Sequence, residues 1–216
     1  VAGAAALTAP TILKAANPSP GRKLFQDPEP FKLKYAPSIG MFRNLAESED
    51  PIDLIRFCHD QGFRAVFDNG LMNRSLEDQE RIANELALLG MDLGPFVLYA
   101  DFGTTSFVTR EPEKQQMLVD LMHKGVETAK LTNAKMALVV LGRYDESLHW
   151  DYQTANAIDN LRMCAEILEP AGLVMVLEPL NTLTDHPGLF LTRIPQAYAI
   201  CRAVNSPSVK IVNDLY

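Results

Sequence analysis

Two acidic residues stand at the ends of two apolar runs in the second half of the chain. Glu178 ends the run that begins at Leu173, and Asp214 ends the run that begins at Val209. If both runs are strands, their side chains alternate between two faces, and both faces of the first run stay apolar until Glu178. That pattern is typical of parallel sheets covered on both sides, in which ligands bind at the carboxyl ends of the strands.

The spacing of Glu178 and Asp214 predicts a metal site, because they are separated by about the length of one βα repeat. Adjacent parallel strands lie about 4.8 Å apart, so carboxylates at matching strand ends can converge on one ion. Divalent Mg²⁺, Mn²⁺ and Co²⁺ accept such oxygen ligands, Zn²⁺ is a further candidate, and a His or water usually completes the shell. The alternative is that the two acids only leave the core for solvent or cap the helices that follow.

Two polar side chains follow Glu178 in the next loop. Asn181 lies just beyond the predicted strand, where it either contacts hydroxyl groups of a ligand or makes a turn. His186 either lines the mouth of the site as a substrate contact or is a solvent-exposed loop residue. Both are candidate substrate-binding residues, each with a structural alternative.

Aromatic residues near other predicted strands are weaker candidates. His149 and Trp150 are expected on the loop after residues 136–141, where they either stack on a sugar face or pack over a helix start. Tyr35 and Tyr99 either reach the centre of the site from their strands or pack in the core, and core packing is the favoured interpretation for both.

The elements that must position these residues recur as short apolar runs, each followed by a segment with helical periodicity. Such alternation predicts parallel strand pairing. Two helix starts are marked in the sequence. One is expected at Asp50, which is followed by Pro51, and the other at Ser75, which lies in a pattern that resembles a capping box. The predicted strands span residues 34–39, 64–67, 93–99, 136–141, 173–178 and 209–214, and later helices cover 111–131, a stretch with apolar positions from 158 to 168, and 194–204. Glycines at 62, 90 and 172 are expected as left-handed caps between helix and strand.

This tandem βα array predicts an α/β fold, either an open doubly wound sheet or most of a (β/α)₈ TIM barrel, which needs about 250 residues and eight strands. About six strands are present in the 216 residues, and no helix follows the last of them. We therefore expect a TIM-barrel domain over residues 31–216 that lacks about two C-terminal βα units. Residues 1–30 are expected to form a signal-peptide remnant and a linker.

Composition limits the partners and the compartment. The chain is 47% hydrophobic and 22% charged with a net charge of −7, which is ordinary for a soluble domain and does not favour binding to nucleic acid. The Ala-rich start, residues 1–16, resembles the apolar part of a secretory signal and is too short to span a membrane. A periplasmic or exported protein is expected, with a cytoplasmic protein carrying an Ala-rich tail as the alternative. The three cysteines lie far apart in predicted helices and are expected to be buried apolar residues.

Three motifs carry a family resemblance. They are the run 176–181 around Glu-Pro-Leu-Asn, the run 187–191, and the run 212–216 around Asp214. These motifs resemble the sugar-phosphate isomerase/epimerase group of xylose isomerase-like TIM barrels, and most of all its hydroxypyruvate isomerase-like branch. Together with the βα rhythm, the resemblance covers the chain from about Phe31 to its end.

The resemblance implies that Glu178 is both a metal ligand and one of two acid/base glutamates, and that Asp214 is a further ligand. It also implies a second Glu and two His, all of which would lie beyond Tyr216. One departure bears on the substrate more than on the metal, since many relatives have Glu at the end of the second strand where this chain has Phe67.

The function implied is that of a divalent-metal-dependent isomerase or epimerase, which acts on a sugar or small hydroxy-carbonyl compound through an enediolate. Such a reaction needs a base beside the carbonyl, an ion at the enediolate oxygens and an acid that returns the proton. Burial would raise the pKa of Glu178 and a bound metal would lower it, so metal occupancy would decide whether Glu178 acts as the base.

Two alternatives stay open. One is a barrel that binds carbohydrate without turning it over. The other is a metal hydrolase that resembles the abasic-site endonucleases, and the acidic net charge of the chain argues against this second alternative. The sequence does not determine the substrate, the choice between isomerisation and epimerisation, or whether the chain forms a homo-oligomer.

Overall fold

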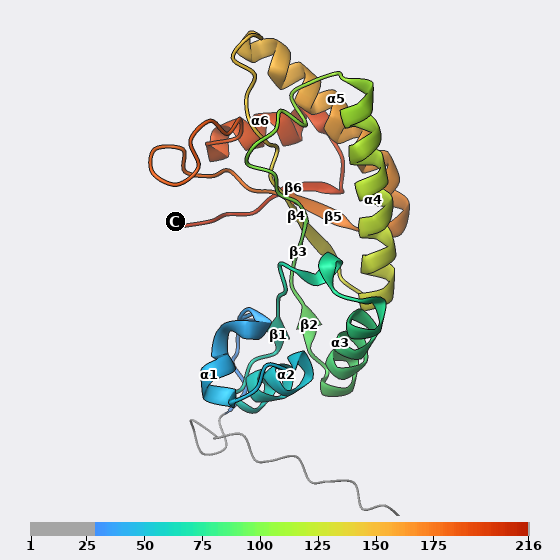
Figure 1. The fold of residues 1–216 in the computed structure, drawn as a ribbon, viewed down its shortest axis with the longest axis vertical. Coiled ribbons are helices and arrows are strands. Elements are labelled where there is room, and N and C mark those ends of the chain that lie inside the picture. Colours follow the sequence, from blue (N-terminus) through green and yellow to red (C-terminus); the bar gives the residue numbers. More distant parts are fainter. Residues whose placement is uncertain (1–28, 216) are drawn as a thin grey trace, which may run out of the picture.

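The computed structural model of the chain describes residues 29–215. The segment interpreted as a signal remnant, and nearly all of the predicted linker, lie outside the described residues, as does Tyr216. Export therefore stays a prediction. Figure 1 shows the described part as a row of strands with the helices α3 (Leu76–Leu89), α4 (Pro112–Thr132) and α5 (Trp150–Leu168) along one side and the C-terminal end on the other side.

Parallel strands in sequence order form the centre of the fold. A four-stranded sheet has the order β3 (Phe96–Tyr99), β4 (Met136–Val139), β5 (Val174–Leu177) and β6 (Val209–Ile211). A second parallel pair joins β1 (Ala65–Val66) and β2 (Asp92–Leu93). Each neighbour in the large sheet is the next strand in the chain, which is the order of a barrel wall and not the reversal of order found at the centre of a doubly wound sheet.

One predicted strand is split in the structure and another is almost absent, and prolines account for both differences. The predicted strand 93–99 is split into β2 and β3 at Gly94 and Pro95, because Pro95 has no N–H for a ladder hydrogen bond. The predicted strand 34–39 is wrong apart from one isolated parallel bridge between Ser38 and Phe67. Pro37 lacks a donor there. Its carbonyl accepts a bond from Phe67 N at 3.0 Å, and Ile39 N donates to Phe67 O at 3.0 Å, before the chain turns into a 3₁₀ helix, η1 (Ile39–Phe42).

Helices alternate with the strands as expected. Neighbouring long helices in the chain pack on each other in turn. None of the helices within residues 29–215 has the length and apolar character needed to cross a membrane. The long helices are α2 (Pro51–Asp60), α3 (Leu76–Leu89), α4 (Pro112–Thr132), α5 (Trp150–Leu168) and α6 (Ile194–Val204), and the short ones are α1 (Arg43–Ala46), η2 (Leu71–Asn73) and η3 (Glu169–Ala171).

Helix ends follow the predicted caps. The Asp50 carboxylate accepts a hydrogen bond from Ile52 N at 2.8 Å, and Ser75 Oγ accepts one from Asp78 N at 3.1 Å. These bonds satisfy N–H groups that the first turn of a helix leaves without a partner. The three predicted joint glycines all have a positive φ, namely Gly62, Gly90 and Gly172.

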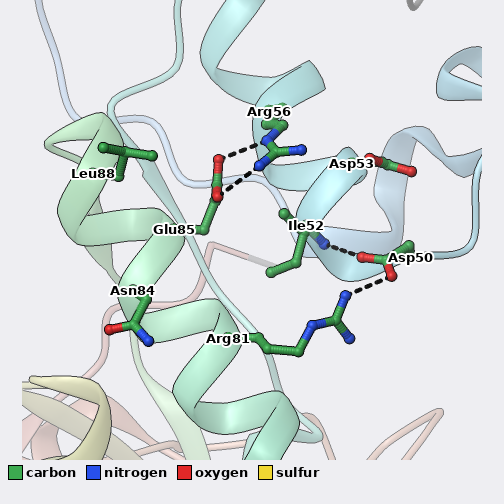
Figure 2. A pocket seen from close by; sticks show the side chains of 8 residues that line it. All are labelled: Asp50, Ile52, Asp53, Arg56, Arg81, Asn84, Glu85 and Leu88. Atoms are coloured by element: carbon green, nitrogen blue, oxygen red, sulfur yellow. Dashed lines mark hydrogen bonds and ion pairs between the residues drawn. The ribbon is translucent and has the colours of Figure 1, made fainter. Parts of the chain in front are cut away.

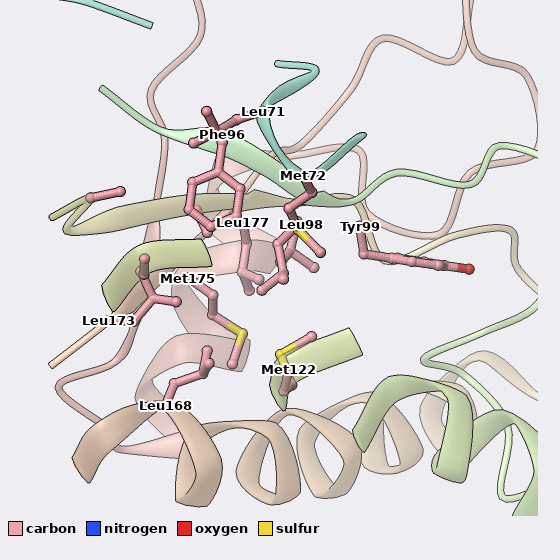
Figure 3. Close-up of a cluster of buried hydrophobic side chains, with 14 of the residues drawn as sticks. Leu71, Met72, Phe96, Leu98, Tyr99, Met122, Leu168, Leu173, Met175 and Leu177 are labelled. Carbon is pink, nitrogen blue, oxygen red and sulfur yellow. The ribbon is translucent and has the colours of Figure 1, made fainter. Parts of the chain in front are cut away.

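The core lies between one face of the strands and the helices (Figure 3). Phe96, Met175 and Leu177 point from the strands toward Met122 of α4 and Leu168 of α5, and all five are fully buried. The opposite face of the sheet is more open, since Met136 is 41% exposed. On β5 itself Val176 lies on that opposite face and is 6% exposed, so the opening concerns the start of β4.

The cysteines are buried or half-buried, as expected, and Cys58 and Cys164 lie in the core. Burial raises the pKa of the Cys58 thiol to about 11 and that of Cys164 to about 12. Both side chains therefore stay uncharged near neutral pH and act as small apolar residues.

A glycine in α4 allows this helix to approach the sheet closely. A methyl group added at Gly125 would lie 2.3 Å from Leu98 Cδ1, and Leu98 is 3% exposed. We expect Gly125→Ala to lower the unfolding free energy by up to about 2 kcal/mol, because overpacking outweighs the better helix propensity of alanine. Urea unfolding measures this effect, with the exposed Lys124→Ala as a control that should change stability by less than about 0.5 kcal/mol.

Candidate functional site

Glu178 is fixed at the carboxyl end of β5. Its backbone N–H donates to Val139 O of β4 at 3.1 Å, which continues the parallel ladder by one bond beyond Leu177. The side chain is half-buried. The sequence predicts Glu178 as the last residue of this strand. In the structure it comes directly after β5 and still makes one ladder bond.

Asp214 lies beyond its strand, whereas the sequence predicted it as the last strand residue. β6 ends at Ile211, and one further ladder bond joins Val212 N to Leu177 O at 3.0 Å. The next bond on this edge would need a donor at residue 179, and Pro179 has no N–H. The chain therefore leaves the sheet before Asp214, whose side chain is exposed.

A cleft of about 430 Å³ lies at this end of the strands. It is lined by residues from the loop after β5 together with Asp214 from the segment after β6. The structure thus brings Asn181, His186 and Asp214 to one cleft, with Glu178 immediately before the lining segment. The lining residues are Pro179, Leu180, Asn181, Asp185, His186 and Asp214.

Glu178 is electrostatically coupled to two of these residues. Partial burial is the main cause that raises the pKa of the Glu178 carboxyl above its ordinary value, and the negative charge of Asp214 raises it further. The nearby His186 acts in the opposite direction and lowers the pKa. The two carboxylates are therefore close enough to interact, which is the arrangement that a bound cation would stabilise.

Asn181 makes the turn that the sequence offered as one of its two roles. Its Oδ1 accepts a hydrogen bond from Leu183 N at 2.9 Å, and its backbone carbonyl accepts one from His186 N at 3.0 Å. This Asx turn folds the loop back over the cleft. The side-chain amide nitrogen is the part of Asn181 left for a ligand hydroxyl, so a contact with substrate stays a prediction.

His186 is half-buried at the cleft, and it stacks on an aromatic residue that the sequence did not single out. The imidazole and the Phe102 ring have centroids 4.8 Å apart and planes inclined by 19°. Phe102 comes from the loop after β3, so two loops from different repeats meet at this point.

The loop after β5 is also held from the opposite side by Arg143, which the sequence did not indicate. Arg143 Nη1 donates to Pro187 O at 3.1 Å, and Tyr144 N donates to Gly188 O at the same distance. Gly188 has φ of +87°, and a Cβ there would lie 2.3 Å from the Arg143 guanidinium. Only glycine gives the loop both this backbone conformation and this close contact.

Other sequence candidates lie elsewhere. Trp150 is the first residue of α5, not a loop residue, and its ring packs 5.0 Å from Phe190. Tyr35 is 53% exposed and packs edge-on against Phe31, so the expectation of core packing is wrong for it because the predicted strand around Pro37 does not form. Tyr99 is buried, with its hydroxyl 3.3 Å from Thr104 Oγ1.

An acid that the sequence did not single out follows β1. Asp68 is buried and stands one residue after Phe67, near the position where relatives were expected to carry Glu. Its carboxylate pairs with Arg74 and accepts a hydrogen bond from Gly70 N at 3.0 Å. Through these bonds the Asp68 carboxylate stabilises its own loop.

A second cleft, of about 470 Å³, lies between α2 and α3 (Figure 2). Its charged residues pair with one another. Arg56 binds the buried Glu85 through two bonds of 2.7 and 3.0 Å, and Arg81 bonds to Asp50 at 2.7 Å, which lowers the pKa of Asp50. Ion pairs join α2 and its N-cap to α3 along this cleft, and none of the predicted site residues lines it.

Two carboxylates at the first cleft have the donor chemistry of metal ligands. No group of three or more His, Cys, Asp or Glu side chains arranged to hold a metal occurs among residues 29–215. The donor chemistry of Glu178 and Asp214 nevertheless fits a hard divalent cation, because both offer carboxylate oxygens and their charges repel each other without a cation. Water and substrate oxygens would complete the coordination shell of such an ion.

The raised pKa of Glu178 predicts a pH-dependent gain in stability on replacing it. A carboxyl whose pKa is higher in the folded state stabilises the fold below its ordinary value of 4.5, and this contribution is lost as the pH rises through the folded pKa. We therefore expect Glu178→Gln, without metal, to unfold at higher urea concentration than the original protein at pH 7, with a smaller difference at pH 4.

Urea titrations in EDTA at the two pH values measure this difference. In an Asp214→Asn background, which removes the charge that helps to raise the pKa of Glu178, the gain at pH 7 should be smaller. A lower stability of Glu178→Gln at pH 7 would contradict the electrostatic account of the site.

Fold and site together define a class of protein. Parallel strands in sequence order, outer helices, and polar loops gathered at the carboxyl ends of the strands are the features of a (β/α)₈ barrel, whose active sites lie at that end. The model of the family described as xylose isomerase-like TIM barrel matches residues 55–216. The chain belongs to this family, and its described part is a partial (β/α)₈ barrel.

Several curated relatives carry the name "Putative hydroxypyruvate isomerase". The protein from Danio rerio is 28% identical over 193 residues, which cover 85% of this chain and 67% of the relative. The protein from Xenopus laevis is 42% identical over 59 residues, which cover 27% of this chain and only 22% of the relative.

Solved structures show the same fold. A family 2 AP endonuclease from Brucella melitensis has a TM-score of 0.69 at 23% identity, and the match covers 84% of this chain and 68% of that one. A 3-keto-D-glucoside 4-epimerase from E. coli has a TM-score of 0.62 at 18% identity, covering 78% and 65%. The IolI protein, solved with a bound zinc atom, has a TM-score of 0.59 at 19% identity, covering 73% and 55%.

Proposed function

We propose that this chain belongs to a divalent-metal-dependent isomerase or epimerase that acts on a sugar or a small hydroxy-carbonyl compound. The observation that carries the proposal is the interacting pair Glu178 and Asp214 beside one cleft at the carboxyl ends of adjacent strands. Two of the curated relatives are named for hydroxypyruvate isomerisation, and one similar structure is a sugar epimerase. The family fold places active sites at this end of the barrel.

In this proposal Glu178 transfers the proton. Its carboxylate removes a proton from the carbon beside the substrate carbonyl, which leaves an enediolate. In an isomerisation the proton returns to the former carbonyl carbon while the hydroxyl proton moves to the former carbonyl oxygen. In an epimerisation a second acid returns a proton to the original carbon from the opposite face. Burial and Asp214 raise the pKa of the Glu178 carboxyl without a cation, and a bound cation would lower it again and keep the carboxylate deprotonated, ready to accept the proton. Partial burial keeps bulk water from competing for the proton.

The other residues of the cleft bind and orient. Glu178 and Asp214 would hold the cation, which when bound would supply positive charge beside the substrate oxygens. His186 and Asn181 line the cleft from the loop after β5, and in this proposal the imidazole and the amide nitrogen contact substrate hydroxyls. Asp214 acts as a ligand only.

Deuterium exchange tests this function directly. The full-length protein with Mn²⁺ is incubated in D₂O with hydroxypyruvate, D-psicose and L-ribulose, and NMR follows deuterium uptake at the carbon beside the carbonyl. The proposal expects uptake and formation of an isomer or epimer with at least one compound. Binding of a sugar with no uptake in any of the three would favour a non-catalytic carbohydrate-binding barrel.

A further inference from the structure

Phe102 is an exposed phenylalanine on a loop whose backbone is fixed. Its ring is 46% exposed. The preceding Asp101 carboxylate accepts hydrogen bonds from Gly103 N at 2.6 Å and Thr104 N at 3.0 Å, which close a tight turn around Phe102. Thr104 O in turn accepts a bond from Arg143 N at 2.8 Å. The turn therefore presents an apolar ring at a defined place on the surface.

His186 lies on a second loop, and Arg143 bonds to this loop as well as to the loop of Phe102. The Asn181 turn fixes the loop on one side, and the bond from Arg143 to Pro187 fixes it on the other. The face of the Phe102 ring meets the face of the His186 ring with only 19° between the planes. Such a parallel contact restricts how the imidazole can rotate about its side-chain bonds.

The rings of His186 and Phe102 differ in whether they line the cleft. His186 lines the cleft, whereas Phe102 is not among the lining residues and lies against His186. Phe102 therefore meets the cleft through the imidazole. The loops of two different βα repeats are joined at this one aromatic contact.

We propose that Phe102 is a positioning residue, which holds the His186 imidazole over the cleft so that it can bind a hydroxyl group of the substrate. The inference rests on the proposed function of the cleft and adds a residue from the loop after β3 to it. Because Phe102 is not among the residues that line the cleft, we expect it to affect substrate binding more than the chemical step.

The test uses Phe102→Leu, which keeps an apolar side chain but removes the aromatic ring, and Phe102→Tyr, which keeps the ring. NMR of the imidazole protons of His186 reports the stack through the ring current of Phe102. The second readout is the separate measurement of KM and kcat with whichever of hydroxypyruvate, D-psicose or L-ribulose exchanges deuterium.

A matched control is Tyr152→Leu. Tyr152 on α5 is another exposed aromatic residue, and it does not line the cleft. Its ring lies 6.2 Å from that of His149. Its replacement removes an aromatic neighbour from a different histidine. It should leave the His186 resonances and both kinetic constants as they are.

The proposal expects Phe102→Leu to move the His186 resonances downfield and to raise KM by up to about tenfold, with a smaller change in kcat and with rescue by Phe102→Tyr. Unchanged His186 resonances in Phe102→Leu, or an equal loss in Phe102→Leu and Phe102→Tyr, would overturn it. If the original protein exchanges none of the three compounds, the proposed function fails, and the NMR comparison still decides whether Phe102 positions His186.

Discussion

Glu178→Gln should reduce turnover by about 10²- to 10⁴-fold, the contribution expected of a positioned acid/base group. The amide has nearly the shape of the carboxylate but cannot accept the proton and is a poorer ligand for a divalent ion. The rate of deuterium uptake by the responsive substrate in D₂O measures the loss. Because the raised pKa of Glu178 means that its charge destabilises the metal-free fold at neutral pH, the variant should still fold.

A carboxylate at the same end of the barrel provides the control. Glu146 is exposed on the loop between β4 and α5 and takes no part in the cleft. Glu146→Gln removes the same charge and should leave turnover unchanged. Equal activity of Glu178→Gln and the original protein would show that Glu178 is not the proton-transfer group.

Leu177→Ala should lower the unfolding free energy by about 2–5 kcal/mol, because the leucine is completely buried between β5 and the helices. Removing its side chain costs the transfer of apolar groups and leaves a cavity beside Met175 and Phe96. Leu177 also holds the strand end from which Glu178 projects, since its carbonyl accepts the last bond from Val212 N. Urea unfolding followed by circular dichroism measures the change.

Leu183→Ala is the matched control for Leu177→Ala. Leu183 is 96% exposed on the loop after β5, and its replacement should change stability by less than about 0.5 kcal/mol. A cost for Leu177→Ala no larger than that for Leu183→Ala would mean that β5 is not packed against the helices as the structure shows.

The helices and the strand order could be predicted because their signals are local. Asp50 and Ser75 bond to N–H groups only two or three residues away, so the caps are visible in the sequence itself. The helix predicted at 194–204 has those bounds in the structure. Apolar runs followed by helical periodicity also predicted the tandem parallel arrangement of a barrel, which the family match supports.

The strand ends were harder to predict because a partner strand decides them. An apolar run does not show where the ladder stops, and Pro37, Pro95 and Pro179 each remove one donor at a strand end. Asp214 is the clearest example. The predicted strand that begins at Val209 continues to Asp214 in the sequence, but its hydrogen-bond ladder with β5 ends opposite Pro179.

The supports of the candidate site could not be predicted, since they join loops that are far apart in the chain. Phe102 meets His186, and Arg143 meets Pro187, only after the strands have brought their loops to the same end of the barrel. No periodicity or cap marks either residue. The available signal was weak: an aromatic residue directly after an aspartate that begins a turn, in a loop following a buried strand.

The central claim is that Glu178 and Asp214 share one divalent cation, and Mn²⁺ binding tests it most directly. Loss of the electron paramagnetic resonance signal of free Mn²⁺ is titrated for the full-length protein, Glu178→Gln and Asp214→Asn. The account predicts one bound Mn²⁺ in the original protein and an affinity at least about tenfold weaker in each variant. An unchanged affinity in both variants, or no binding by the original protein, would contradict it.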